Sequence, residues 1–161
     1  MRWKKVSLLG LCTALAMSLS FLESLVPPLM PGVKLGLANI AAVFVLYRVG
    51  VKEAAAVSLA RIILVNLLFG SVTGFAYSLA GGALSLLAMV LLKCGGRFSC
   101  VSVSVVGGVC HNIGQIAVAC AVTGTRQLVW YLPVLLVSGI SAGIVIGLLA
   151  GIVLQRIGGG S

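Results

Sequence analysis

Long apolar runs separated by short polar breaks dominate the chain. Six such runs occur, at residues 6–26, 35–49, 54–69, 72–92, 100–122 and 128–154. A helix that crosses the hydrocarbon core of a bilayer needs about 20 apolar residues, and fewer where neighbouring helices bury its ends. Proline, glycine and charged residues mark the breaks, and Pro27-Pro28 ends the first run. The pattern predicts an all-α integral membrane protein with six transmembrane helices and short loops.

Composition agrees with this pattern. The chain has 161 residues, of which 61% are hydrophobic and 8% charged, whereas about a quarter of the residues of soluble domains are charged. This excludes a soluble enzyme or a nucleic-acid-binding module as the first interpretation. We expect a single membrane domain over residues 1–157, with a tail or added linker at residues 158–161. Residues 1–21 also resemble a signal peptide, but the apolar stretch is longer than usual for one.

Basic residues are distributed unevenly between the breaks. Eleven Lys and Arg stand against two Glu, and Asp is absent. With both termini in the cytoplasm, eight basic residues flank the runs on the inner side and two, Lys34 and Arg126, lie outside. Basic residues accumulate on the cytoplasmic side of membrane proteins. We therefore expect a multi-pass protein of the cell membrane with cytoplasmic termini, surrounded by lipid and not bound to nucleic acid.

Small residues at four-residue spacing mark the faces of two predicted helices. The sixth run carries four glycines in such a series: Gly139, Gly143, Gly147 and Gly151. A similar series lies in the first run: Gly10, Ala14 and Ser18. In lipid, such a face lets a second helix approach closely. For the sixth run we favour packing within the chain, with a homodimer through this face as the alternative. The first series suits internal packing and a partner protein equally.

Polar residues within the runs gather in the outer halves, and the inner halves are almost purely apolar. Burying a polar or charged group in lipid is expensive, so each one is a candidate functional residue. We predict a pocket that opens to the outside under a lid of residues 29–36 and binds a small molecule through Glu23, Lys34, Asn39, Arg61, Asn66, Ser78, His111, Asn112 and Gln115. The alternative is that these groups hydrogen-bond one another and only hold the helices together.

Charge suggests how the pocket residues divide their roles. Lys34 and Arg61 would meet an anionic group of the ligand, and His111 with its neighbours would orient polar edges. At about 1.5 Å of rise per residue, Glu23 and Arg61 would differ in their depth in the membrane by roughly 13 Å, which is long for a direct contact. We therefore expect Glu23 to pair with Lys34, and Arg61 to meet His111 or a ligand anion.

Residue types that are scarce or absent limit the chemistry of the chain. One His and two Glu, without Asp, are too few ligands for a metal site. No motif for ATP hydrolysis or for nucleophilic catalysis occurs. We expect no catalytic residue and no cofactor. Uphill transport would then need energy from a partner protein or an ion gradient.

Several blocks of residues have a recognisable form. They are 31–40 (PGVKLGLANI), 78–85 (SLAGGALS), 111–115 (HNIGQ) and 131–134 (YLPV), with Glu23 before Pro27-Pro28 and Arg61 before 67–70 (LLFG). Over about residues 6–156, these blocks resemble the bacterial Gx transporter family, also catalogued as heptaprenyl diphosphate synthase component I. That family is similar to the substrate-binding subunits (S components) of energy-coupling-factor transporters.

The resemblance implies a fold and a function. S components are six-helix membrane proteins that bind a vitamin-like solute from outside and dock on a membrane coupling subunit with two ATPases, often through small residues of the first helix. The chain would accordingly be a non-enzymatic subunit for uptake of a small anionic, vitamin-related or isoprenoid-related solute.

Two other functions stay open. One is a non-catalytic membrane accessory subunit of polyprenyl diphosphate synthesis. Prenyltransferases hold diphosphate through magnesium on Asp-rich motifs, and this chain has no Asp. The other is a self-contained secondary carrier, dimeric through the glycine face of the sixth run.

Overall fold

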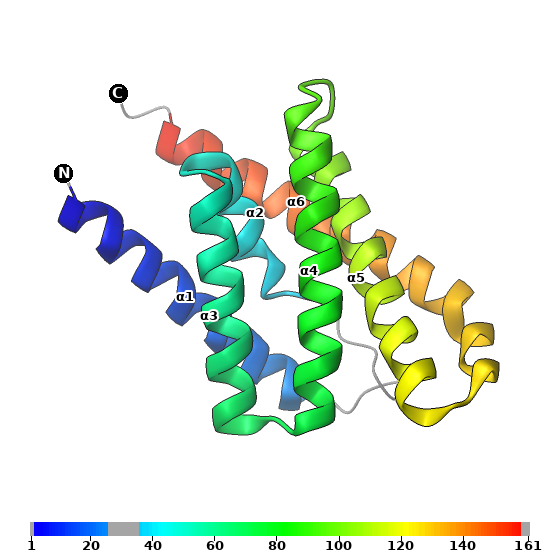
Figure 1. Ribbon diagram of the computed structural model, residues 1–161. Coiled ribbons are helices and arrows are strands. Elements are labelled where there is room, and N and C mark those ends of the chain that lie inside the picture. The colour runs from blue at the N-terminus through cyan, green and yellow to red at the C-terminus, as the bar shows by residue number, and fades with distance from the viewer. Residues whose placement is uncertain (1, 26–35, 159–161) are drawn as a thin grey trace.

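The computed structural model describes residues 2–25 and 36–158, and the regular elements in these ranges are all helices (Figure 1). They are α1 (Arg2–Leu25), α2 (Asn39–Arg48), α3 (Val51–Phe69), α4 (Val72–Cys94), α5 (Cys100–Thr123), the 3₁₀ helix η1 (Arg126–Tyr131) and α6 (Leu132–Gly158). Each predicted apolar run therefore contains one α-helix, and the all-α prediction is confirmed.

The lengths of these helices support four of the six predicted transmembrane spans. Four helical segments of the described chain are long and apolar enough to cross a bilayer: Trp3–Leu25, Val72–Cys94, Cys100–Thr123 and Arg126–Ile157. Helix α2 has 10 residues, about 15 Å at 1.5 Å per residue, which is half of a ~30 Å hydrocarbon core. Helix α3 has 19 residues but carries Lys52, Glu53 and Arg61. The structure thus supports a multi-pass membrane protein with four candidate spans.

Local backbone geometry decides where the α-helices of two runs begin. The second run was predicted from residue 35, but residues 36–38 form a turn in which Gly36 has φ +73° and the N–H of Asn39 donates to the Gly36 carbonyl at 2.8 Å. The sixth run was predicted from residue 128, but η1 precedes the α-helix there. Pro133 then stands in the first turn of α6, where a helix tolerates proline.

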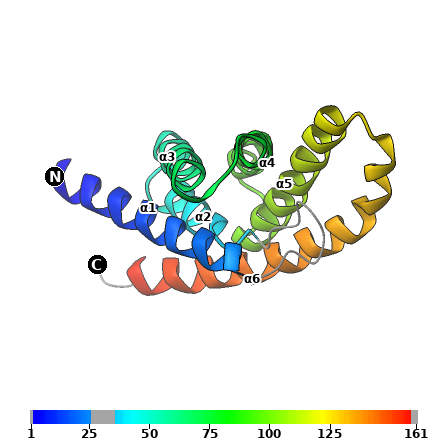
Figure 2. The same ribbon diagram turned by 90° about the horizontal axis from the view of Figure 1, so that it is seen from below.

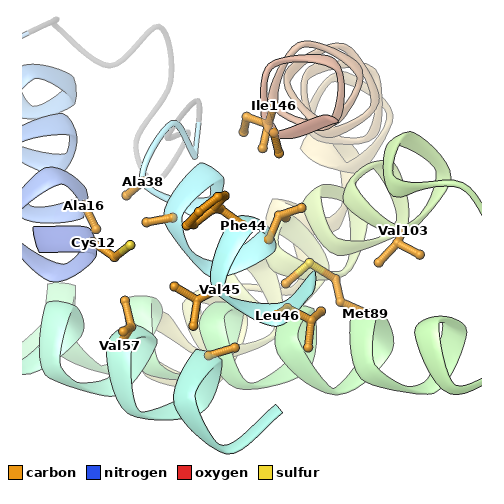
Figure 3. Packing of buried hydrophobic residues seen from close by; sticks show 14 residues of the cluster. Cys12, Ala16, Ala38, Phe44, Val45, Leu46, Val57, Met89, Val103 and Ile146 are labelled. Atoms are coloured by element: carbon orange, nitrogen blue, oxygen red, sulfur yellow. The ribbon is translucent and has the colours of Figure 1, made fainter. Parts of the chain in front are cut away.

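Helix α2 lies at the centre of the bundle. Figure 2 shows α1 and α6 along one side and α3, α4 and α5 along the other, with α2 between them. Its residues 41–46 are all buried. A helix that is apolar on every side is expected to be enclosed by others. Side chains from the five other α-helices surround it in the core, among them Cys12, Ala16, Val57, Met89, Val103 and Ile146 (Figure 3).

The outer surface of the bundle is apolar. Leu11 on α1 and Val137 on α6 are each 68% exposed, and Leu87 on α4 is 57% exposed. Large contiguous apolar surfaces are rare on soluble monomers, whereas hydrocarbon solvates them well. The surface therefore fits a membrane protein, in agreement with the hydropathy of the chain.

Basic side chains gather at one end of the bundle. Both termini, the α2–α3 turn and the α4–α5 loop lie at this end (Figure 1). We call it the basic end; its residues include Lys4, Lys5, Arg48, Lys52, Lys93, Arg97 and Arg156. The α3–α4 junction and the α5–η1 connection lie at the opposite end of the bundle. Of the described basic residues, Arg126 lies at that end.

Charged side chains from two other helices meet the two ends of α2. Glu23 of α1 accepts hydrogen bonds from the backbone N–H groups of Gly36 and Leu37, the second at 3.2 Å. Lys93 of α4 donates to the carbonyl of Leu46. A helix carries partial positive charge at its N-terminus and partial negative charge at its C-terminus. Both side chains are therefore placed favourably, and they hold a short helix that has no side-chain N-cap of its own.

Glycines allow α5 and α6 to pack backbone against backbone. A Cβ atom on Gly139 would lie 3.0 Å from the carbonyl oxygen of Gly108. A Cβ atom on Gly143 would lie 2.5 Å from the Cα of Val105, and one on Gly147 would lie 2.6 Å from the α5 backbone. These glycines pack within the chain, so α5 covers most of the face that the sequence offered for a homodimer.

A substitution at this contact should destabilise the bundle. We expect Gly143→Leu to lower the free energy of unfolding by about 1–3 kcal/mol or more, because the added side chain forces the two helices apart. Gly151 is the matched control, since a Cβ atom there would have no atom within 4 Å. The check is thermal unfolding of the purified chain in detergent. Equal loss of stability in Gly143→Leu and Gly151→Leu would contradict this account of the contact.

Candidate ligand-binding site

A cleft with polar walls lies between α1, α3, α4 and α5. We call it the polar cleft; it is lined by Ser20, Glu23, Gly36, Arg61, Ile62, Val65, Asn66, Ser78 and His111. Glu23 and Asn66 stand near the C-terminal ends of their helices and Ser78 near the start of α4. Because these helix ends lie together, opposite the basic end, the fold collects residues that are far apart in the sequence. Five predicted site residues line this cleft.

Glu23 and Arg61 line the same polar cleft, although among the described residues no ion pair or hydrogen bond between these two is recorded. Helix α1 runs obliquely across α3 (Figure 1), which brings its C-terminal part to this cleft. The Glu23 carboxylate is near enough to act electrostatically on the Arg61 guanidinium. Opposite charges inside a low-dielectric bundle compensate part of each other's desolvation. Lys34, the partner predicted for Glu23, lies outside the described residues.

The Arg61 guanidinium supplies hydrogen-bond donors to this cleft. No hydrogen bond joins it to another residue in the described ranges. A guanidinium presents five N–H donors in a planar fork that matches carboxylate and phosphate groups. Glu23, by contrast, already accepts from the turn before α2. The arrangement therefore suits an anion beside Arg61.

A second cleft lies deeper in the bundle, between α2, α4, α5 and α6. We call it the central cleft; it is lined by Gly36, Asn39, Val43, Met89, Ser104, Gly108, His111, Asn112, Gly139, Ala142, Gly143 and Ile146. The Nδ2 of Asn112 donates to the Leu135 carbonyl at 2.6 Å, which fixes the orientation of this amide. Gly36 and His111 line both clefts, so the two adjoin there.

Gln115 lies outside both clefts, and Asn66, which lines the polar cleft, also bonds its own helix. Gln115 lines neither cleft and is buried beside Gly81, where a Cβ atom would lie 3.0 Å from the Gln115 Cγ. Its Oε1 has no hydrogen-bond partner within the described part of the chain. The Nδ2 of Asn66 donates to the Ile62 carbonyl one turn earlier, at 2.7 Å. These amides therefore serve helix packing at least in part.

Ser104 is a cleft residue that the sequence reasoning missed. The inner halves of the helices were expected to be almost purely apolar, yet Ser85 and Ser104 are buried there at 1% and 3% exposure. Ser104, Gly108 and His111 follow one another at spacings of four and three residues, which places them on one helix face. That periodicity is the signal that could have found Ser104.

The described residues contain no group of three or more His, Cys, Asp or Glu side chains placed to hold a metal ion. The polar side chains of the two clefts are amides, hydroxyls, one imidazole, one carboxylate and one guanidinium. Such groups bind organic ligands through hydrogen bonds and charge.

Comparison with known proteins identifies the family. The model of the family described as heptaprenyl diphosphate synthase component I matches residues 12–153. The chain belongs to this family. No curated protein and no solved structure matches the chain. All residues that line the two clefts lie within the part of the chain that the family model matches. The family name describes one component of a synthase and implies assembly with a further subunit, whereas the similarity to S components stays a prediction.

The contact between Glu23 and the turn before α2 can be tested by replacing the carboxylate in this family member. We expect Glu23→Gln to speed hydrogen–deuterium exchange at the Gly36 and Leu37 amides by about tenfold or more, because a charge-assisted acceptor is lost. Exchange measured by mass spectrometry on the full chain in detergent is the check.

Glu53→Gln provides the matched control, because the chain has only these two acidic residues. Glu53 pairs with Lys5 at the basic end, and exposed pairs of this kind contribute little to stability. Exchange at Gly36 and Leu37 should stay unchanged in this variant. Unchanged exchange in Glu23→Gln as well would show that the carboxylate does not hold the turn.

Proposed function

We propose that the chain is a non-enzymatic, S-component-like subunit that captures a small anionic solute for uptake across the cell membrane. The observation that carries this proposal is the convergence of polar side chains from four helices on one cleft of an otherwise apolar bundle: Glu23, Arg61, Asn66, Ser78 and His111. Polar and charged groups at membrane depth are costly and mark ligand pathways in membrane proteins.

The distribution of basic residues supports access to the site from outside. Basic residues favour the cytoplasmic side, so the basic end of the bundle is assigned to the cytoplasm together with both termini. The polar cleft is lined from helix ends that lie opposite the basic end, such as those bearing Glu23 and Asn66. In this orientation a solute enters from the outer face.

The outer face of α1 suits a partner in the membrane. Gly10, Ala14 and Ser18 are all exposed in the described structure, and a Cβ atom on Gly10 would have nothing within 4 Å. Leu11 and Leu15 beside them are 68% and 51% exposed. A stripe of small residues between leucines allows another transmembrane helix to approach closely. We assign this face to a membrane coupling subunit that carries separate ATPases.

The family name favours one second candidate, a membrane accessory subunit of polyprenyl diphosphate synthesis. In that role the chain would hold a soluble synthase at the bilayer and would be non-catalytic, in keeping with the lack of Asp. The two candidates differ in their partners, since uptake requires ATPases and the accessory role requires a prenyl synthase.

Removal of the charged and imidazole groups should abolish solute binding. We expect Arg61→Ala and His111→Ala to reduce the small molecule retained by the purified protein by about 10-fold to 100-fold, because hydrogen bonds to charged groups are worth about 1.5–3 kcal/mol. Mass spectrometry of molecules released from the full chain in detergent measures this, and circular dichroism confirms that the variants fold.

Lys52→Ala is the control on the same helix as Arg61, because Lys52 is exposed at the basic end. Retention should equal that of the unmodified chain. Equal retention in all three variants would refute the pocket, and copurification with a prenyl synthase in place of ATPases would favour the accessory role.

A further inference from the structure

The central cleft is small and enclosed by apolar side chains. It offers about 10 Å³ to the centre of a water-sized molecule, and one buried water needs about 10–15 Å³ of such space. Its walls include Val43, Met89 and Ile146, which are at most 3% exposed. The cleft therefore has room for one molecule of the size of water and is too small for a larger solute.

Neutral hydrogen-bonding groups nevertheless line the central cleft. Asn39 of α2 and Ser104 of α5 are 8% and 3% exposed. Neither side chain makes a hydrogen bond with another residue of the described ranges. Asn112 also lines the cleft, and because its Nδ2 donates to the Leu135 carbonyl, its side-chain oxygen is a further acceptor there. Buried polar groups are normally hydrogen-bonded, so these side chains indicate a small polar molecule between them.

Water suits this cleft better than a metal cation of similar size. Among the described residues that line the cleft, none is Asp or Glu. A cation moved there would lose its hydration without gaining a counter-charge. Water needs no counter-charge, and the Asn39 amide and the Ser104 hydroxyl can each both donate a hydrogen bond to it and accept one from it. Apolar cavities of proteins stay dry, whereas small polar ones hold an ordered water with two to four partners.

We propose that the central cleft binds one ordered water molecule, held by Asn39 and Ser104 with the Asn112 side chain as a further partner. The water connects the buried start of α2 with α5 and completes the hydrogen bonding of two polar side chains in an apolar core. This inference goes beyond the proposed function and does not rest on it, because the solute is assigned to the polar cleft.

Met89 can report on this water, because it lines the central cleft and is 2% exposed. An X-ray pulse produces hydroxyl radicals from bound water as well as from bulk water, and these radicals oxidise a methionine beside them to the sulfoxide. The full chain in phosphatidylcholine nanodiscs is pulsed, and the sulfoxide at each methionine is measured by mass spectrometry. Leu46→Met is the matched control, since Leu46 is 0% exposed and lines neither cleft. We expect Met89 to be oxidised at least about fivefold faster than the methionine introduced at position 46.

Two variants remove the proposed partners of the water. Asn39→Leu replaces the amide by a larger apolar side chain that takes up the cleft, and it should lower Met89 oxidation to the rate at position 46. Ser104→Ala removes one hydroxyl and should lower Met89 oxidation at least about twofold. Ser141→Ala is the control, because this exposed hydroxyl donates to the Val137 carbonyl of its own helix, and Met89 oxidation should stay unchanged. Thermal unfolding shows that the variants fold, and Ser104→Ala decides if Asn39→Leu does not.

Three results would overturn the water site. The first is equal oxidation of Met89 and of the methionine introduced at position 46. The second is a rate of Met89 oxidation that stays unchanged in the folded variants at Asn39 and Ser104. The third is a thermal unfolding midpoint that rises in sodium chloride relative to choline chloride and no longer does so in Ser104→Ala, because a sodium ion would then occupy the cleft in place of water. The proposed function is judged separately, by the solute that the purified chain retains.

Discussion

The enclosure of α2 is the constraint on which the rest of the bundle depends. A helix leaves N–H groups at its start and carbonyl groups at its end without partners inside the helix. Helix α2 has 10 residues; its last residue, Arg48, is exposed at the basic end, whereas its first, Asn39, is buried inside the bundle, away from water at the membrane surface. Glu23 from α1 meets the turn at its start, and Lys93 from α4 meets its last turn. Two of the chain's few charges thus stabilise a buried apolar helix.

This arrangement also shapes the candidate site. Glu23 accepts from the Gly36 and Leu37 amides, so it fixes the turn whose Gly36 lines both clefts. The same carboxylate balances part of the charge of Arg61. Glu23 therefore positions the turn before α2 and also lines the cleft beside Arg61.

Close packing of α5 on α6 contributes to the site in a second way. Gly108, Gly139 and Gly143 allow these helix backbones to approach, and the same residues line the central cleft. In a membrane the hydrophobic effect does not drive helices together, so close van der Waals contact holds them. Side chains at these glycines would separate the helices and fill the cleft. Helix packing and the central cleft therefore depend on the same small residues.

The sequence by itself determined the helices, the membrane environment and the candidate polar residues. These follow from local properties: apolar runs specify helices in lipid, and lone polar residues within them stand out against their neighbours. The sequence also contains the blocks from which the family was predicted, and the match to the family model confirmed that prediction.

Only the tertiary structure decided which polar residues meet. The oblique crossing of α1 over α3 placed Glu23 and Arg61 on one cleft, and packing enclosed α2 as a core helix although its run resembles a span. The polar face of α5 extended the site inward to Ser104. The physical reason is that periodicity tells which residues share a helix face, whereas crossing angles and depth arise from packing between helices that are distant in the chain.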